Sequence, residues 1–367
     1  MIATVSFPGR ACHPSPTLKR ERDGMTIVES TRPITGGVDT HLDVHVAAAL
    51  DPNGGVLGVE SFATTPAGYR ELHGWLAGFG ELTRVGVEGT GAYGAGLARF
   101  LQRAGVEVIE VDRPNRQERR RNGKSDQLDA VEAARGALGG RCQAVAKTGD
   151  GSMEAMRALL VAKRSGRQAR VRSLNQIRHL SFTAPDDLRV RLQHVPARQL
   201  AATTARLGPS GDVVSSATKL AMRSLGRRVL DLDAELEIVD DALAGLVTAT
   251  APGLLALHGV GVDTAAILLV AAGDNPERIR SEAAWAHLCG VAPIPASSGK
   301  VTRHRLNAGG NRQANHALWR IVMTRMSSDP RTRRYVERRV EEGRSKREII
   351  RILKRYVARE TWRHLPS

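Results

Sequence analysis

Alternation of apolar and polar positions dominates the first third of the chain. Residues 37–50 alternate with many β-branched side chains, and after a Pro-Asn-Gly-Gly turn residues 56–62 form another such run. Period-two runs on either side of a turn predict a β-hairpin or meander. A helix is expected over 65–78, and the short apolar runs at 84–88 and 107–111 alternate with further helical segments. The pattern predicts an α/β unit.

From about residue 151 the apolar spacing changes from two to between three and four, which is typical of helices. A basic helix is expected over 153–180, and a less regular stretch interrupted by prolines covers 185–211. Apolar residues then recur at alternating intervals of four and three, as in the a/d seam of a coiled coil. The seam consists of Leu225, Val229, Leu232, Leu236, Val239, Leu243 and Leu246. A helical hairpin within the chain would bury it as well, but we favour a dimerising coiled coil.

The last third predicts compact helices. Residues 252–293 place a tight glycine turn, at 258–261, between two helices; such a turn can offer backbone N–H groups to a phosphate or simply join helices. The loop 293–300 carries two adjacent hydroxyls and precedes a helix that ends near residue 326. From residue 331 the tail is expected to be one arginine-rich helix with a solvated or nucleic-acid-binding face.

These changes of pattern divide the chain into four parts. Residues 1–33 mix proline, arginine and serine without a clean apolar stretch, so a disordered extension is expected there and not a signal peptide. The α/β unit is assigned to 34–148, a helical dimerisation region to 149–250 and a C-terminal helical domain to 251–367. No apolar run reaches the roughly 18–20 residues that span a bilayer, so no membrane association is expected.

Charge points to the kind of partner. The 367 residues include 54 Lys and Arg against 38 Asp and Glu, which gives a net charge of +16. Because basic side chains release counterions from phosphates, this balance predicts a polyanionic partner. The three cysteines lack metal-ligand spacing, which is typical of a protein from a reducing cytoplasm.

Four acids are the first candidate chemistry. Asp126 and Asp129 open a predicted helix, and a spacing of three places both carboxylates on one face. Their repulsion would be relieved by a divalent cation, although aspartate is also common in a first helical turn because of the helix dipole. Asp39 lies within an apolar strand and Glu88 ends another, where open α/β sheets form their ligand crevice. Together the four acids predict a Mg²⁺ site beside a phosphodiester.

The hydroxyl loop is the second candidate. Lys300, Arg303 and Arg305 could hold a phosphate against a serine nucleophile, and no Asp–His relay of the protease type is evident nearby. A strongly basic run also precedes the Asp126 helix. The residues predicted to contact nucleic acid are Arg116, Arg119, Arg120, Arg121, Lys124, Lys300, Arg303, Arg305 and Arg312.

Taken in order, these motifs resemble the insertion sequence 110 family of transposases. The family's Asp-Glu-Asp-Asp signature is similar to residues 37–41, 87–91 and 124–130. Its C-terminal transposase domain is similar to residues 258–261, 286–293, 297–300 and 310–312. The likeness runs from about residue 35 to 357 with a helical spacer between the two halves.

The resemblance implies α/β plus all-α architecture: an N-terminal RuvC-like (RNase H-type) domain, a coiled-coil linker and a small C-terminal helical domain with a catalytic serine. It implies Ser298 as the nucleophile, with Ser297 as the fallback because adjacent serines leave the match ambiguous by one position. The implied Mg²⁺ ligands are Asp39, Glu88, Asp126 and Asp129.

The resemblance also implies partners. Family members are recombinases whose element encodes a structured noncoding bridge RNA that pairs with donor and target DNA. The serine forms a covalent protein–DNA intermediate, and the carboxylate site of a neighbouring subunit activates the phosphate. A homo-oligomer, with dimers assembling into a tetramer, is therefore expected in the bacterial cytoplasm at the nucleoid.

Three functions compete at this point. The first is an RNA-guided DNA recombinase that acts through a 5′-phosphoserine. The second is a RuvC-type nuclease that cuts with metal-activated water and uses its serine only structurally. The third is an architectural nucleic-acid-binding protein with a decayed site, against which the intact set of four acids argues.

Overall fold

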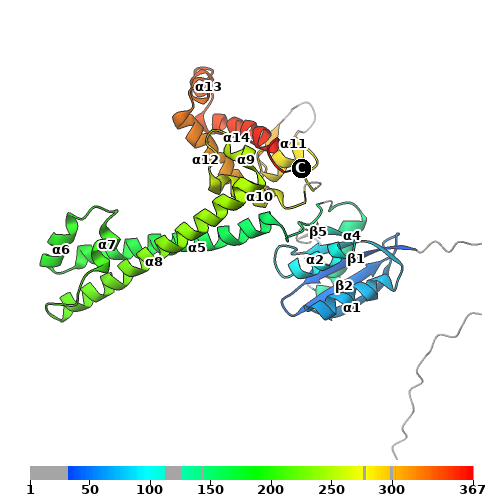
Figure 1. Ribbon diagram of the computed structural model, residues 1–367. Helices are drawn as coiled ribbons and strands as arrows, with labels where there is room; N and C mark the ends of the chain where they lie inside the picture. Colours follow the sequence, from blue (N-terminus) through cyan, green and yellow to red (C-terminus); the bar gives the residue numbers. More distant parts are fainter. Residues whose placement is uncertain are drawn as a thin grey trace, which may run out of the picture.

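The computed structural model describes residues 32–111, 125–142, 144–275, 278–297, 301 and 303–366. An α/β unit lies at one end, a long two-helix arm extends from it, and a group of C-terminal helices stacks over the inner end of the arm (Figure 1). Residues 1–31 of the expected extension lie outside the described residues. The domain boundaries drawn from the sequence stay a prediction.

A five-stranded sheet forms the core of the α/β unit, in the order β3-β2-β1-β4-β5. Its strands are β1 (Pro33–Thr40), β2 (Val44–Leu50), β3 (Val56–Ala63), β4 (Glu81–Glu88) and β5 (Glu107–Val111). The first three pair antiparallel, whereas β4 and β5 run parallel to β1 and to each other. The alternating pattern therefore predicted the meander and both later strands correctly.

Helices cover both faces of this sheet. They are α1 (Pro66–Ala77), α2 (Ala95–Arg103) and α4 (Asp126–Leu138). Leucines of α1 and α2 pack with Val38, Val85 and Val87 on one face. The other face is covered by α4, whose small side chains contact Val46 and Leu50. The mixed α/β architecture is the expected one and is consistent with a RuvC-like domain.

The arm consists of two antiparallel helices, α5 (Ser152–Thr183) and α8 (Val213–Thr250). Val229, near the middle of α8, packs with Ile177 near the end of α5, while Leu243, further along α8, packs with Met156 near the start of α5. The apolar seam is thus paired within the chain, as the hairpin alternative predicted, and the favoured dimeric pairing is not what the structure shows for it. Heptad spacing is the same in both cases, so the sequence could not separate them.

The stretch expected to be less regular is in fact largely helical. It contains α6 (Asp186–Gln193) and α7 (Leu200–Ala205), which close the outer end of the arm. Leu188 and Leu192 of α6 pack with Met222 of α8. The prolines that suggested irregularity only delimit these short amphipathic helices.

The C-terminal part is a cluster of helices around a common apolar core. The helices are α9 (Pro252–Leu255), α10 (Val262–Ala272), α11 (Glu282–Leu288), α12 (Arg312–Ser328), α13 (Pro330–Glu341) and α14 (Lys346–Trp362). The predicted glycine turn before α10 is present, with Gly259 at φ 79°. The prediction of a single tail helix was wrong, because the tail forms two helices. Gly343, at φ 80°, ends α13, and the Ser345–Glu348 capping box starts α14.

A short β-ribbon, β6 (Ile294–Pro295) with β7 (His304–Arg305), carries the loop with the two serines. The α/β unit contacts the C-terminal helices directly, because Asn275 donates to the Ala146 carbonyl at 3.0 Å and Arg278 donates to the Val145 carbonyl at 3.0 Å. Among the described helices, none is long and apolar enough to cross a membrane.

Candidate active site

The ends of two neighbouring strands position the first two acids. Parallel pairing matches Val38 of β1 with Val87 of β4, so Asp39 and Glu88 are the next residues on adjacent strands. Side chains alternate along a strand, and the two valines face α1 and α2. Asp39 and Glu88 therefore belong to the opposite face, under α4. The Thr40 hydroxyl donates to the Glu88 carbonyl at 2.7 Å and ties the two strand ends together.

Two glycines allow α4 to lie directly on this face. A Cβ atom at Gly37 would be 2.2 Å from the Ala134 nitrogen, and one at Gly86 would be 2.4 Å from the Ala133 carbonyl oxygen. Neither contact is possible for a larger residue without moving the helix. The close approach brings the first turn of α4, with Asp126 and Asp129, to the carboxyl ends of β1 and β4.

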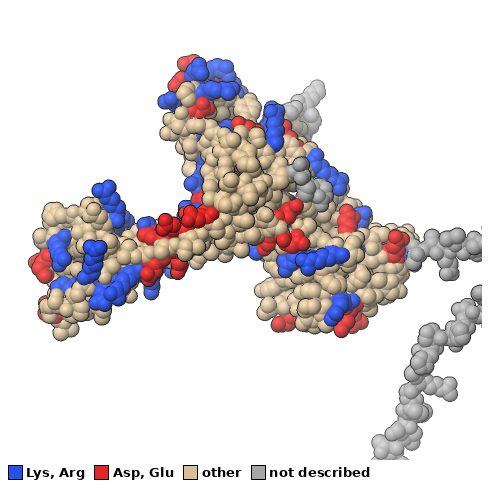
Figure 2. All heavy atoms as spheres, viewed as in Figure 1, with Lys and Arg blue, Asp and Glu red and all other residues tan. Residues whose placement is uncertain are grey.

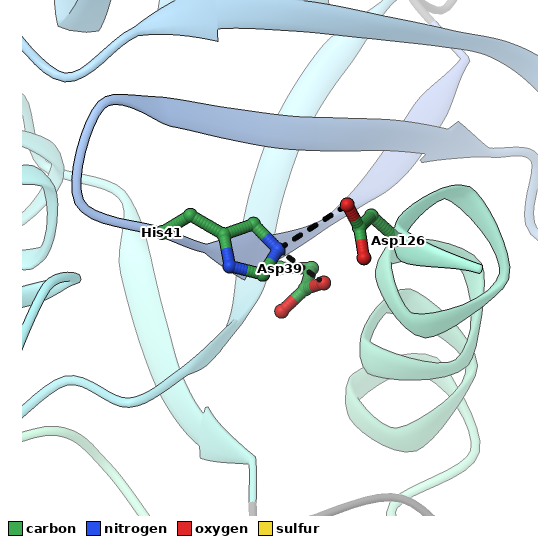
Figure 3. Close-up of side chains that lie close together, drawn as sticks. All are labelled: Asp39, His41 and Asp126. Carbon is green, nitrogen blue, oxygen red and sulfur yellow. Dashed lines mark hydrogen bonds and ion pairs between the residues drawn. The ribbon is translucent and has the colours of Figure 1, made fainter. Parts of the chain in front are cut away.

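Asp39, His41 and Asp126 form one cluster, which Figure 3 shows between the end of β1 and the start of α4. The His41 Nε2 atom lies 3.1 Å from an Asp39 carboxylate oxygen and 3.5 Å from an Asp126 carboxylate oxygen. One ligand atom from each residue lies within 4.8 Å of the others. A cluster of this size with two carboxylates can hold a divalent metal ion.

Burial and neighbouring negative charges both disfavour the anionic form of Asp39. Its side chain is almost fully buried, and this burial raises the pKa of its carboxyl group. The negative charges of Asp129 and Asp126 raise that pKa further, while His41 opposes the shift. Asp129 is also buried. Three of the four predicted acids therefore act on one another at one edge of the sheet, and a cation placed among them would lower this cost.

His41 is the residue that sequence reasoning did not assign to the site. It follows β1 by one residue and reaches back to Asp39 from the turn toward β2. The available signal was a histidine two positions after a strand-end aspartate, because neighbours at that spacing lie on the same side of an extended chain. Such a histidine can orient the carboxylate or serve as a ligand itself.

At the second candidate site, the described serine belongs to the ribbon's own hydrogen bonding. The Ser297 hydroxyl accepts from the Arg303 N–H at 3.1 Å and donates to the Arg303 carbonyl at 3.4 Å. Arg303, Arg305 and Arg312 are exposed. Ser298 and Lys300 lie outside the described residues, as do Arg116, Arg119, Arg120, Arg121 and Lys124.

The fold and the cluster of acids together indicate a class of protein domain. A mixed sheet in this order, with acids at the carboxyl ends of its central strands and on the helix that covers them, is consistent with RuvC-like domains that act on phosphodiesters. A family model for transposases of the Asp-Glu-Asp-Asp IS110 type matches residues 36–183, and the model of the Transposase IS116/IS110/IS902 family matches residues 251–337. The chain belongs to the IS110 family of transposases.

One curated relative is an Insertion element IS110 uncharacterized 43.6 kDa protein from Streptomyces coelicolor (strain ATCC BAA-471 / A3(2) / M145). The two chains are 37% identical over 95 residues, which is 26% of this chain and 23% of the relative. The match thus spans about a quarter of each protein. It agrees with the family assignment.

Proposed function

We propose that this protein is a transposase that cuts and rejoins DNA strands of an insertion sequence. In this proposal Asp39, Glu88, Asp126 and Asp129 bind Mg²⁺ beside the scissile phosphodiester. The observation that carries it is the cluster of Asp39, His41 and Asp126, held where α4 lies against two glycines of the sheet.

The residues fit a divalent cation by their own chemistry. Burial and the charges of two further acids disfavour the anionic form of Asp39, and a cation close by would stabilise it. Carboxylate oxygens are the ligands that Mg²⁺ prefers. When bound, the ion would neutralise charge on the phosphate under attack. His41 would hold the Asp39 carboxylate in place through its hydrogen bond.

The nucleophile in this proposal is Ser298, with Ser297 as the fallback. The Ser297 hydroxyl is already used within the ribbon, which favours its neighbour. The attacking Ser298 oxygen forms a bond to phosphorus while the bond from phosphorus to the 3′ oxygen breaks. That 3′ oxygen takes up a proton, and the hydroxyl proton passes to solvent, so a 5′-phosphoserine results. A 3′ hydroxyl of the second DNA strand then displaces the serine and reseals the backbone.

The proposal includes partners that the family resemblance implies. A structured noncoding guide RNA would select the DNA sites by base pairing, and a dimer or tetramer of the chain would hold the two DNA molecules. The exposed Arg303 and Arg305, in and beside β7, and Arg312, at the start of α12, would contact the phosphates. The net charge of +16 supports a nucleic-acid partner.

Substitution of Asp39 by Asn tests the metal site with two readouts of opposite sign. Mg²⁺ affinity, measured by calorimetry, should fall at least about tenfold because an anionic ligand is lost, and strand exchange should stop. The free energy of unfolding of the metal-free protein, measured by urea titration in EDTA, should meanwhile rise by about 1 kcal/mol, because a buried charge beside two acids is removed.

The exposed Asp43, in the turn after β1, provides the matched control. Asp43→Asn removes the same charge and should leave cation affinity and strand exchange unchanged. An Asp39→Asn protein that still exchanged strands would refute the proposed metal site.

A RuvC-type nuclease with a structural serine is the second candidate, and the hydrogen bonds of the Ser297 hydroxyl within the ribbon fit both functions. The two functions differ in one product. With Ser298→Ala, the transposase loses the covalent protein–DNA adduct on a denaturing gel, whereas a nuclease still cuts the strand. An adduct that persists in Ser298→Ala and disappears in Ser297→Ala would assign the neighbouring hydroxyl.

A further inference from the structure

A cavity of about 730 Å³ opens at the base of the β6–β7 ribbon. Its walls come from the residues before β6, the residues after β7, the start of α12 and the middle of α14. Pro293 and Leu306, which directly flank the two strands, both line it. The cavity therefore lies at one end of the ribbon, and the serine loop lies at the other.

Glycines and amide side chains build the floor of this cavity. Gly290, at φ 66°, crosses Gly310 so closely that a Cβ on Gly310 would be 2.4 Å from the Gly290 Cα. Asn315 donates to the carbonyls of Cys289 and Gly290, at 2.9 and 3.1 Å. Its own carbonyl accepts from the Lys354 ammonium at 2.8 Å. The position of Lys354 is thus fixed by the same side chain that shapes the floor.

Positive charge gathers at this cavity, where Glu348 is the acid next to Arg351. Arg312, Arg351 and Lys354 line it, and within the described part of the chain none of them forms an ion pair with a carboxylate. Arg355, which also lines it, is paired with Glu282 of α11. Partial burial and the nearby Arg351 lower the pKa of Lys354. Cations held together are costly when acids offset only part of their charge, and an anionic ligand would lower that cost.

The remaining lining is apolar and includes an aromatic ring. Val291, Pro293 and Leu306 contribute aliphatic surface, and Tyr356 is about half exposed at the wall. An anion combined with a flat apolar group satisfies both halves of the cavity, and a nucleotide has this composition. Aromatic rings stack on unpaired bases in single-strand binding sites. A hollow of this volume suits one small ligand and is too small for a duplex.

We propose that this cavity, the strand-end pocket, binds one unpaired nucleotide of the DNA strand whose phosphate the serine attacks. Its phosphate contacts Arg312, Arg351 and Lys354, and its base lies against Leu306 and Tyr356. The inference rests on the proposed function, because it is the serine loop at the other end of the ribbon that makes DNA the occupant. A nucleotide held here would fix the position of the next phosphate along the strand.

Fluorescence anisotropy with labelled DNA in EDTA tests the pocket without requiring catalysis. Single-stranded DNA should bind the Arg351→Gln/Lys354→Gln protein at least about tenfold more weakly, and the slope of log K against log salt should shrink by about 1.4 for two lost contacts. The control Lys346→Gln/Arg347→Gln removes the same charge from exposed positions of α14 outside the pocket. It should change affinity by less than about threefold.

A second variant tests the shape of the pocket without altering charge. Ala308 is exposed and lines the cavity, so Ala308→Trp should fill it and weaken single-strand binding while leaving fully paired duplex binding as it was. Equal losses in the Lys346/Arg347 control and the pocket variant would overturn the inference. So would unchanged binding by Ala308→Trp, or a loss confined to single-stranded RNA of the same sequence.

Failure of this inference and failure of the proposed function are distinguishable. If the pocket variants bind DNA like the unaltered protein while Asp39→Asn abolishes strand exchange, the pocket assignment alone is wrong. If Asp39→Asn still exchanges strands while the pocket variants lose single-strand affinity, the proposed metal chemistry alone is wrong.

Discussion

Two ionisable residues buried in the same sheet, Asp39 and His45, have different surroundings. Asp39 faces α4 and has acids and a histidine as neighbours, so its buried charge can be offset by a cation. His45 of β2 is fully buried and stacks on Tyr69 of α1, with ring centroids 5.7 Å apart. Neither ring nitrogen of His45 has a hydrogen-bond partner among the described residues. Burial lowers its pKa to about 4, so it is neutral in the folded protein near pH 7.

His45 should make the fold sensitive to acid. Its folded pKa lies below the usual 6.5, so between these values the unfolded chain binds a proton that the folded chain does not. Stability is therefore lost as the pH falls from 6.5 toward 4, by up to about 3 kcal/mol. His45→Phe keeps the stacked ring and should remove this loss. The free energies of unfolding of the two proteins, compared at several pH values, should diverge through that window; parallel curves would contradict the assignment.

At the residue scale, the sequence predicted three acids that interact in the structure, because their motifs are local. Asp39 ends an alternating strand, and Asp126 with Asp129 opens a helix. His41 was not assigned because it belongs to no element and its role appears only when α4 lies over the strand end. The pocket at the ribbon was not predicted either, since its walls come from three segments that are separate in the sequence.

At the scale of elements, the contact between α4 and the sheet determines whether the acids meet. Gly37→Ala should test this contact, because the added Cβ would be 2.2 Å from backbone atoms that cannot move alone. The helix must shift, which should cost about 1–3 kcal/mol in unfolding free energy and weaken Mg²⁺ binding at the same time. Thermal unfolding with EDTA and calorimetry with Mg²⁺ would measure the two effects.

Gly74, within α1, is the matched control. A Cβ there meets nothing within 4 Å, so Gly74→Ala should stabilise the protein by about 0.5–1 kcal/mol, because alanine loses less entropy in a helix. It should leave Mg²⁺ affinity unchanged. If Gly37→Ala lost stability but kept full Mg²⁺ affinity, the position of α4 would not control the metal site.

The elements also show what periodicity can and cannot predict. The strands and most helices followed from their spacing because each buries one face, and spacing records that face. Spacing does not identify the partner, so it could not show that α5 packs against the seam of α8 at Val229 and Leu243. The tail was taken as one helix because arginine favours helices on both sides of Gly343; only the positive φ of that glycine breaks it.

At the scale of the whole molecule, charge is unevenly distributed. Figure 2 shows Lys and Arg gathered at the outer end of the arm and over the C-terminal helices, with Asp and Glu in a band along the middle of the arm. In the sequence of α8, Asp233, Asp240 and Asp241 lie in its second half, and they line one hollow with Arg167 and Arg170 of α5. Nucleic acid should therefore contact the two ends of the arm more closely than its middle.

The arrangement of the two candidate sites makes a prediction about assembly. Asp126 lies at the edge of the sheet and Ser297 lies on the ribbon of the C-terminal cluster, so each site needs groups from both halves of a chain or from two chains. The family resemblance favours two chains. A subunit altered at Asp126 and a subunit altered at Ser298 should then complement each other, because the mixed dimer contains one site with both groups intact.

Strand exchange by equal mixtures of Asp126→Asn and Ser298→Ala proteins measures this directly. Each protein alone should be inactive, and the mixture should recover about a quarter of normal activity, since half the dimers are mixed and each has one complete site. The double variant Asp126→Asn/Ser298→Ala, mixed with either single variant, is the control and should recover none. If every site is instead built within one chain, the mixture stays as inactive as its components.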